Sequence, residues 1–574
     1  MSSFISAMDV LSNRTVGVNG SDVYTQPVGE SQELLALFGA LNRDLSRDTL
    51  KTLMETAAGT ATLEDLTVLA FHTRDILEGK GERDLFYNMF HVLYKKSPDV
   101  LLNLVKLIPD YGAWFDLQKI VETGIKNGDM SSEHFSQGVS VRNSEYITAF
   151  KNNNLVDTIV TTYSKQLLKD NIPEAKATLA AKWAPRENKH NGWLGGLIAS
   201  KSFPSVRINT ERLKMYRQLL STLNARIDTV ERKMCHDADK QHHFADIQPS
   251  KVPARCLKTK RKAFFNEDKK GEIRKPQDAD RMACREKFQT HMAKAVNGEA
   301  KVHGKVLMPH EFIVEAHSGR VCTENDRTTL QAQWNDMRDG VLAKGTLGKT
   351  VVMCDFSGSM SGTPMDVSMG LGLLCAETTS PAFRDRIITF DSKPTWHNVS
   401  KFSGLFNRIH SFRGVSQGTS TNFQAAMDMV LDRLVEANVP VGEEPDIILV
   451  ITDMGWDQAN ANTNYGGPKV PKFETHIDRI KRDFGSRGGW KTPTIVIWNV
   501  SGKFQQYHHE SDTEGVCVIS GWSPTILKYI MAGDDIVEKM KTMTPYKMMR
   551  AVLDDPRYDP IRAAVNGPTA VIDV

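Results

Sequence analysis

From residue 349 onward, short apolar runs alternate with amphipathic segments, and this alternation constrains the fold more than any other feature of the chain. Strands are expected at 350–355, 386–391, 446–452, 493–499 and 515–519. Helices are expected at 365–377, 401–409, 422–437, 474–484, 522–531 and 534–553. Strands that alternate with helices form a parallel sheet with both faces covered. This part of the chain is therefore predicted to be a doubly wound (Rossmann-like) α/β domain.

Two of the expected strands lead directly into an aspartate, Asp355 and Asp453. Ser357 and Ser359 follow the first aspartate at alternate positions, and Thr421 stands just before an expected helix. Ligands of open α/β sheets bind beyond the carboxyl ends of the strands, where these side chains are expected. Carboxylate and hydroxyl oxygens suit a hard cation, so the five residues predict a site for Mg²⁺ or Mn²⁺. The alternative is a Ser-rich turn whose hydroxyls only cap the following helix.

The rest of the chain shows helical periodicity without strand patterns. Residues 1–30 are polar and are expected to form a loose arm, and residues 31–181 to form a helical repeat region. Between Asp84 and Tyr94, for example, apolar residues recur on one helical face. Short helices joined by short turns are typical of stacked HEAT-like pairs. Residues 182–345 are expected to continue this region as a basic, mainly helical segment, and residues 346–574 to form the α/β domain.

Positive charge is concentrated in the middle of the chain. Residues 182–305 carry 28 Lys and Arg against 14 Asp and Glu, although the whole chain has a net charge of only +3. A local surplus of this size favours an acidic partner such as RNA, and a solvated lysine-rich surface is the alternative. The candidate RNA-contacting residues are Lys182, Arg186, Lys189, Arg255, Lys258, Lys260, Arg261 and Lys262. Trp183 lies among them and is either a stacking surface for a base or a core residue at a helix exit.

Cysteine usage and hydropathy point to a cytoplasmic location without membrane insertion. The chain has seven scattered cysteines and no Cys-x-x-Cys pair, which is typical of reduced thiols. Its first residues lack the features of a secretory signal, and no apolar run reaches the ~20 residues that a membrane helix needs. Cys235, His236, His242, His243 and Cys256 are possible zinc ligands, but their spacing matches no usual zinc-binding arrangement.

The order Asp355-x-Ser357-x-Ser359, Thr421 before Asn422, and Asp453 resembles the metal-ion-dependent adhesion site (MIDAS) of von Willebrand factor A (vWA) domains. In that family the matching residues bind a divalent cation and leave one coordination position for an acidic ligand. Phe356 departs from the pattern, because many vWA domains carry a smaller apolar residue there.

The chain as a whole resembles the Ro ribonucleoprotein family, in which helical TROVE repeats precede a vWA domain, and related TROVE-like proteins of plants, microbes and large viruses. The resemblance is carried by residues 74–83, 181–187, 251–254, 261–264 and 307–311. It implies a non-enzymatic RNA-binding protein of the ribonucleoprotein type, with a vWA domain that captures an acidic group of a partner. Two other functions stay open: a protein–protein interaction scaffold that uses the metal site, and a metal-dependent nuclease.

Overall fold

The structure is a computed structural model that describes residues 14–16, 20–24, 31–130, 143–235, 241–318, 322–413, 421–456, 475–487, 489–503, 509–531 and 536–567. The chain forms two compact units. The sheet unit contains residues 1–61 and 244–555, and the helical unit contains residues 62–243 and 556–574. These units differ from the divisions expected at 181/182 and 345/346, because residues 244–345 pack with the sheet. Within the described residues, no helix is long and apolar enough to cross a membrane.

A six-stranded sheet in the order β5-β4-β3-β6-β7-β8 forms the centre of the sheet unit. The strands are β3 (Thr350–Asp355), β4 (Arg386–Phe390), β5 (Thr395–Asn398), β6 (Ile447–Thr452), β7 (Thr494–Asn499) and β8 (Val516–Ser520). All neighbouring pairs are parallel except β4 and β5, which are antiparallel. The five expected strands are therefore confirmed, while the edge strand β5 was not predicted. The parallel sheet confirms an α/β arrangement in the C-terminal part of the chain.

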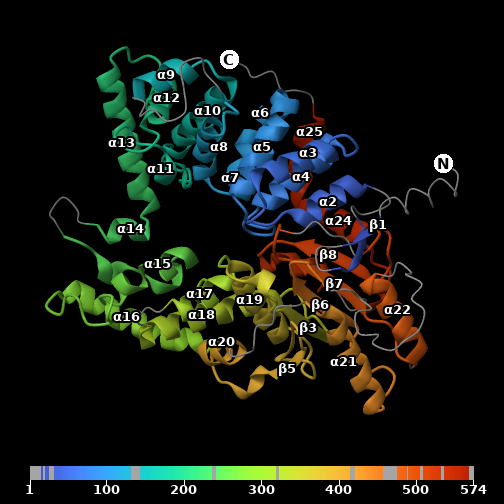
Figure 1. The fold of residues 1–574 in the computed structure, drawn as a ribbon. Helices are drawn as coiled ribbons and strands as arrows, with labels where there is room; N and C mark the ends of the chain where they lie inside the picture. The colour runs from blue at the N-terminus through green and yellow to red at the C-terminus, as the bar shows by residue number, and fades with distance from the viewer. Residues whose placement is uncertain are drawn as a thin grey trace. The chain divides into compact units, whose positions relative to one another are not determined.

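Successive residues of the central strands contribute to opposite cores, as the alternation of strand side chains requires. Val352 and Cys354 face a core that includes α17 (His310–His317), α18 (Glu324–Leu342) and α19 (Thr363–Glu377). Val351 and Met353 face a second core with α21 (Phe423–Glu436) and α22 (His476–Arg487). Figure 1 shows these helices on the two sides of the strands. Burial on both faces explains why the strands are continuous apolar runs.

The remaining elements of the sheet unit include a two-stranded antiparallel pair, β1 (Arg14–Val16) and β2 (Asp22–Tyr24), where a loose arm was expected. The other helices are α2 (Gln32–Ala40), α3 (Arg47–Ala57), α15 (Ala254–Phe264), α16 (Ala279–Val296), α20 (Leu405–Arg413), α23 (Ile536–Lys541) and α24 (Pro545–Leu553).

Three helix predictions in the sheet unit were wrong in detail. The helix expected at 401–409 is shifted by four residues, to α20 (Leu405–Arg413). The helix expected at 522–531 is a 3₁₀ helix, η6 (Pro524–Tyr529). The helix expected at 534–553 is divided into α23 and α24 because Thr544 caps a new helix at Lys547 N (3.1 Å) and Pro545 occupies its first turn.

The described part of the helical unit contains only helices and turns. Its α-helices are α4 (Leu63–Arg74), α5 (Asp84–Lys96), α6 (Pro98–Leu104), α7 (Ile108–Tyr111), α8 (Trp114–Lys126), α9 (Asn143–Phe150), α10 (Asn154–Asp170), α11 (Ala180–Trp183), α12 (Gly192–Ser202), α13 (Asn209–Ile227), α14 (Val230–Lys233) and α25 (Asp559–Asn566). The C-terminal helix α25 packs against α4 and α6. Just before α25, Arg557 forms an ion pair with the buried Asp75 (2.9 Å), and Tyr558 bonds His72 (3.0 Å).

Candidate metal centre

Asp355 occupies the last position of β3 and is completely buried. Its strand lies between β4 and β6, which exclude water from both sides. The backbone N–H of Ser357 donates to Asp355 Oδ1 (2.9 Å), and the hydroxyl of Thr452 donates to Asp355 Oδ2 (2.7 Å). These two bonds fix the plane of the carboxylate at the carboxyl end of the sheet.

The loop after Asp355 brings the two predicted serines together. Ser357 Oγ lies 3.1 Å from Ser359 Oγ; Ser357 is buried and Ser359 is half-buried. Phe356 is buried and packs against Phe412, with the ring centroids 5.1 Å apart. The large side chain of Phe356 therefore anchors the loop in the core. Gly362, at φ +90°, then turns the chain into α19.

Asp453 directly follows β6 and completes the acidic pair. Cys354 of β3 is in register with Ile451 of β6, which places both aspartates at the same end of neighbouring strands. The backbone N–H of Gly455 donates to Asp453 Oδ1 (3.1 Å). Asp453 Oδ2 is buried and has no hydrogen-bond partner among the described residues. A buried carboxylate oxygen without a donor is costly and is suited to a cation.

The protonation of the two carboxyls reflects their burial and proximity. Burial, followed by repulsion from Asp453, raises the pKa of Asp355 to about 7, while its bonds from Ser357 and Thr452 act in the opposite direction. Burial also raises the pKa of Asp453, against the lowering effects of Ser359 and Lys503. A divalent cation would stabilise the ionised forms of both groups, and the available oxygen donors fit Mg²⁺ or Mn²⁺.

Thr421, the fifth predicted ligand, is buried at the start of α21. The next residue, Asn422, caps this helix and donates its backbone N–H to the carbonyl of Asp391 (3.0 Å), just beyond β4. Phe423 then stacks on Trp456, with ring centroids 4.3 Å apart, in the segment that follows Asp453. These contacts hold the beginning of α21 at the same edge of the sheet as the two aspartates.

Three residues of this region were not predicted from the sequence. Thr452 donates to Asp355, and Lys503 donates to the carbonyl of Ser359 (2.8 Å). Asp44 accepts from the hydroxyl of Ser501 (2.6 Å) and so holds the loop that carries Lys503. Thr452 belongs to an apolar strand run, and the contacts of Asp44 and Lys503 join distant parts of the chain. The sequence carries no local pattern that identifies them.

Four of the predicted RNA-contacting residues belong to α15. They form ion pairs with carboxylates of the same unit. Arg255 and Lys258 pair with one glutamate at 2.8 and 3.2 Å. Arg261 pairs with a glutamate and, at 2.6 Å, with an aspartate that also pairs with Lys262 at 2.7 Å. The acidic partners are Glu311, Glu315 and Asp326, together with Glu267, which pairs with Lys262 at 3.4 Å. Their charge offsets much of the positive surplus that the sequence shows here.

The other four predicted RNA-contacting residues form fewer ion pairs. Lys182 pairs with Glu231 at 3.0 Å. Arg186, Lys189 and Lys260 are exposed. RNA contact by the eight residues stays a prediction, and exposure favours the last three for that role.

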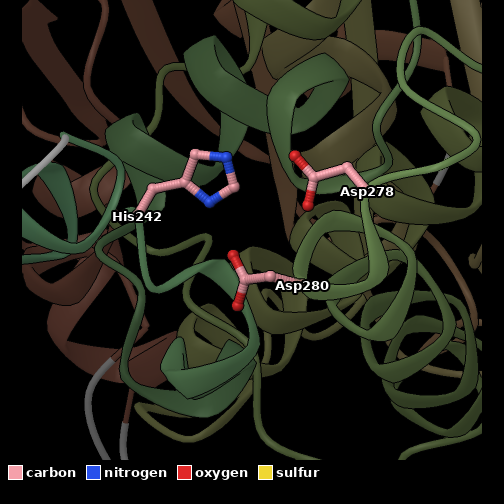
Figure 2. A group of neighbouring side chains, drawn as sticks. All are labelled: His242, Asp278 and Asp280. Atoms are coloured by element: carbon pink, nitrogen blue, oxygen red, sulfur yellow. The ribbon is translucent and has the colours of Figure 1, made fainter. Parts of the chain in front are cut away.

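Figure 2 shows two further carboxylates, those of Asp278 and Asp280, at the beginning of α16. Asp278 caps the helix by accepting from the backbone N–H of Arg281 (3.1 Å). Asp280 accepts from the backbone N–H groups of Phe244 and Ala245, both at 2.8 Å. These bonds give both side chains a structural role, and we infer no metal centre from them.

Comparison with known proteins finds two family models, both described as domains of unknown function. DUF2828 matches residues 145–347 and DUF7788 matches residues 349–563, so the matches meet where β3 begins. The chain is also similar to the "Uncharacterized protein L728" of Acanthamoeba polyphaga mimivirus. The two are 27% identical over 505 residues, which cover 86% of this chain and 80% of the relative. No solved structure matches the chain.

Proposed function

We propose that the chain is a non-enzymatic, ribonucleoprotein-type binding protein. In this proposal the sheet unit is a vWA domain that holds Mg²⁺ or Mn²⁺ at a MIDAS site, and the helical unit, with TROVE-like and HEAT-like repeats, binds RNA. The observation that carries the metal half is the buried pair Asp355 and Asp453, with the unpartnered oxygen Asp453 Oδ2. Two ionised carboxylates this deep in the protein need a compensating positive charge.

The residues that would hold the cation are Asp355, Ser357, Ser359, Thr421 and Asp453. When bound, the cation supplies a Lewis-acidic position for an anionic oxygen of a partner. The protein's contribution is orientation: Thr452 and the Ser357 amide fix the first carboxylate, and the Gly455 amide fixes the second. This arrangement supports capture of an acidic ligand.

Metal binding is tested with the full chain and Mn²⁺, by electron paramagnetic resonance of the free ion. The expected result is one tight site, weakened at least 10–100-fold in Asp453→Asn, the range already seen when only outer-shell partners are lost. Asp339→Asn, at an exposed aspartate of the same unit, is the matched control. Wild-type protein without a Mn²⁺ site, or equal affinity in Asp453→Asn, would contradict the proposal.

A pocket in the helical unit supports the RNA half. Its volume is about 890 Å³, and Trp114 and Trp183 line it together with Lys106, Lys165 and Lys169. None of the three lysines forms an ion pair within the part of the chain that the structure describes. Trp183 packs on Phe115, with ring centroids 5.2 Å apart, but stays 37% exposed, so part of its ring can meet a ligand. Unpaired RNA bases stack on such rings while lysines contact the phosphates.

The RNA half is tested by electrophoretic mobility shift with single-stranded RNA at low and high salt. The triple variant Lys106→Ala, Lys165→Ala and Lys169→Ala should bind at least about ten-fold more weakly at low salt. The slope of log affinity against log salt should flatten by about 2, because each lost phosphate contact contributes about 0.7. The control replaces three exposed lysines elsewhere on the helical unit, Lys96, Lys126 and Lys151.

Absence of wild-type binding at low salt would refute RNA binding. Unchanged affinity in the triple variant would refute the role of the pocket. Mg²⁺-dependent shortening of the RNA on the same gels, lost in Asp355→Ala, would replace the non-enzymatic proposal by the nuclease alternative.

The carboxylate-and-hydroxyl chemistry of the metal site also favours a second candidate function, a protein–protein interaction scaffold. There the cation would bind an acidic side chain of another protein. A pull-down with wild type and Asp355→Ala tests this: partners that depend on the metal are lost in the variant. If every partner persists, the scaffold function at this site is refuted.

A further inference from the structure

The loop after β7 places a positive charge beside the proposed metal site. The ammonium of Lys503 donates to the carbonyl of Ser359 at 2.8 Å, within the loop that carries the two serines. Its charge also acts on Asp453, where it helps to lower the pKa of the carboxyl. Lys503 itself is exposed and keeps hydrogen-bonding capacity for an incoming group.

This lysine is held in place by the N-terminal part of the sheet unit. Asp44 accepts from the hydroxyl of Ser501 (2.6 Å) and from the backbone N–H of Gly502 (2.7 Å). Gly502 lies so close to Leu45 that a Cβ atom at position 502 would be 2.9 Å from Leu45 Cα. The hydrogen bonds to Asp44 and the close contact with Leu45 hold the backbone of Lys503 in one position. A backbone that is already ordered loses less conformational entropy when a ligand binds.

We propose that Lys503 makes a second contact to the anion that the metal site captures, and that it selects a phosphate monoester over a carboxylate. This inference rests on the metal site proposed above. A carboxylate carries one negative charge and has two oxygens, one of which is used at the cation. A phosphate monoester carries about −1.5 to −2 charge at pH 7 and has three acceptor oxygens. With one oxygen bound to the cation, the phosphate keeps two oxygens and the larger negative charge for the contact with the lysine. Lysine is also an established type of phosphate-binding side chain.

The inference predicts effects of opposite sign for the cation and the anion. In Lys503→Met, a positive charge near the cation is lost, so Mn²⁺ affinity stays equal or increases. Affinity of the Mn²⁺-loaded protein for inorganic phosphate decreases about ten-fold or more, the usual range for a lost hydrogen bond to a charged group. Affinity for acetate changes by less than about three-fold. Lys503→Arg, which keeps the charge, retains the preference for phosphate.

The experiment uses the full chain with Mn²⁺ affinity from electron paramagnetic resonance, and anion affinity from paramagnetic broadening of the phosphate ³¹P and acetate ¹³C signals. Uridine 5′-monophosphate is added as a second phosphate probe. If uridine 5′-monophosphate binds more tightly than inorganic phosphate, the phosphate group that the site recognises belongs to a nucleotide. If the two bind equally, the site recognises the phosphate group alone. Lys401→Met, at an exposed lysine of the same unit, is the matched control.

An unchanged ratio of phosphate to acetate affinity in Lys503→Met would overturn the inference. A parallel loss of Mn²⁺ and phosphate would also overturn it, because it would show that Lys503 only supports the loop. Failure of the wild-type protein to bind Mn²⁺ is a different result, which refutes the proposed metal site itself.

Discussion

Replacing Asp355 by Asn should change the stability of the metal-free protein with opposite signs at low and high pH. Burial and the neighbouring Asp453 raise the pKa of Asp355 from 3.8 to about 7. A carboxyl whose pKa is higher in the folded than in the unfolded protein stabilises the fold while it is protonated. That stabilisation decreases as pH rises from the unfolded pKa through the folded pKa. Because a tenfold change in proton affinity corresponds to about 1.4 kcal/mol, the wild type should lose about 3 kcal/mol between pH 5 and pH 8 through this group.

Asparagine removes the titration but disturbs the local hydrogen bonds. Thr452 Oγ1 already accepts from the backbone N–H of Met454 and the indole N–H of Trp456, both at 3.0 Å, and donates to Asp355. An Asn amide N–H₂ at this place would give Thr452 a third donor, at a cost of about 1–2 kcal/mol. Asp355→Asn should therefore be less stable than wild type by that amount at pH 3, about equally stable at pH 5, and more stable by about 3 kcal/mol at pH 8.

The free energy of unfolding is measured by urea titration in EDTA. Pulsed hydrogen–deuterium exchange with mass spectrometry follows peptides from β3 and β6, so that the signal reports the unfolding of the sheet unit alone. The same titration with Mg²⁺ at about 100 times its dissociation constant should add about 2.7 kcal/mol to the wild type and nothing to the variant. The reasoning is refuted if the difference between the two proteins is the same at pH 5 and pH 8.

Three further substitutions test an ion pair and the packing of the sheet unit. Arg261→Met removes one of the two cations that pair with the buried Asp326 and leaves Lys262, so the free energy of unfolding should fall by about 1–3 kcal/mol in the same urea assay, and an unchanged value would contradict the network. Gly372→Ala should cost about 1–3 kcal/mol because its Cβ would lie 2.3 Å from Cys354 Sγ. By contrast, Gly485→Ala in α22 has open space and should stabilise the unit by about 0.5–1 kcal/mol; equal effects of the two substitutions would refute the packing argument.

The parallel part of the sheet was predictable because its strands are buried on both faces and therefore appear as uninterrupted apolar runs. The edge strand β5 has no such run: Trp396 is 51% exposed and Pro394 precedes the strand. Its pairing with β4 depends on tertiary contacts. The division between α23 and α24 was within reach of the sequence, since Thr544-Pro545 places a capping side chain directly before a proline of the first helical turn.

The candidate site was predictable to the extent that it depends on strand order. Asp355 and Asp453 are neighbours because each follows a parallel strand, and the two strands pair directly. The contacts of Lys503 and Asp44 depend instead on which distant loops meet at that edge. A lysine and an aspartate separated by more than 450 positions share no sequence pattern, so only the folded chain reveals them.

The basic surplus shows how a charge count along the sequence can differ from the charge that a partner meets. The counted segment ends at residue 305, whereas three of the four carboxylates that pair with α15 among the described residues follow at Glu311, Glu315 and Asp326. The count therefore includes the basic side chains of this ion-pair network without most of its acidic ones, because α15 packs against α18, far along the chain. Lys165 and Lys169, in a region with no marked surplus, form no ion pair among the described residues and line a pocket with two tryptophans. An anion responds to charge that is not already neutralised nearby, so these two lysines are better placed to bind RNA than the densest basic run of the sequence.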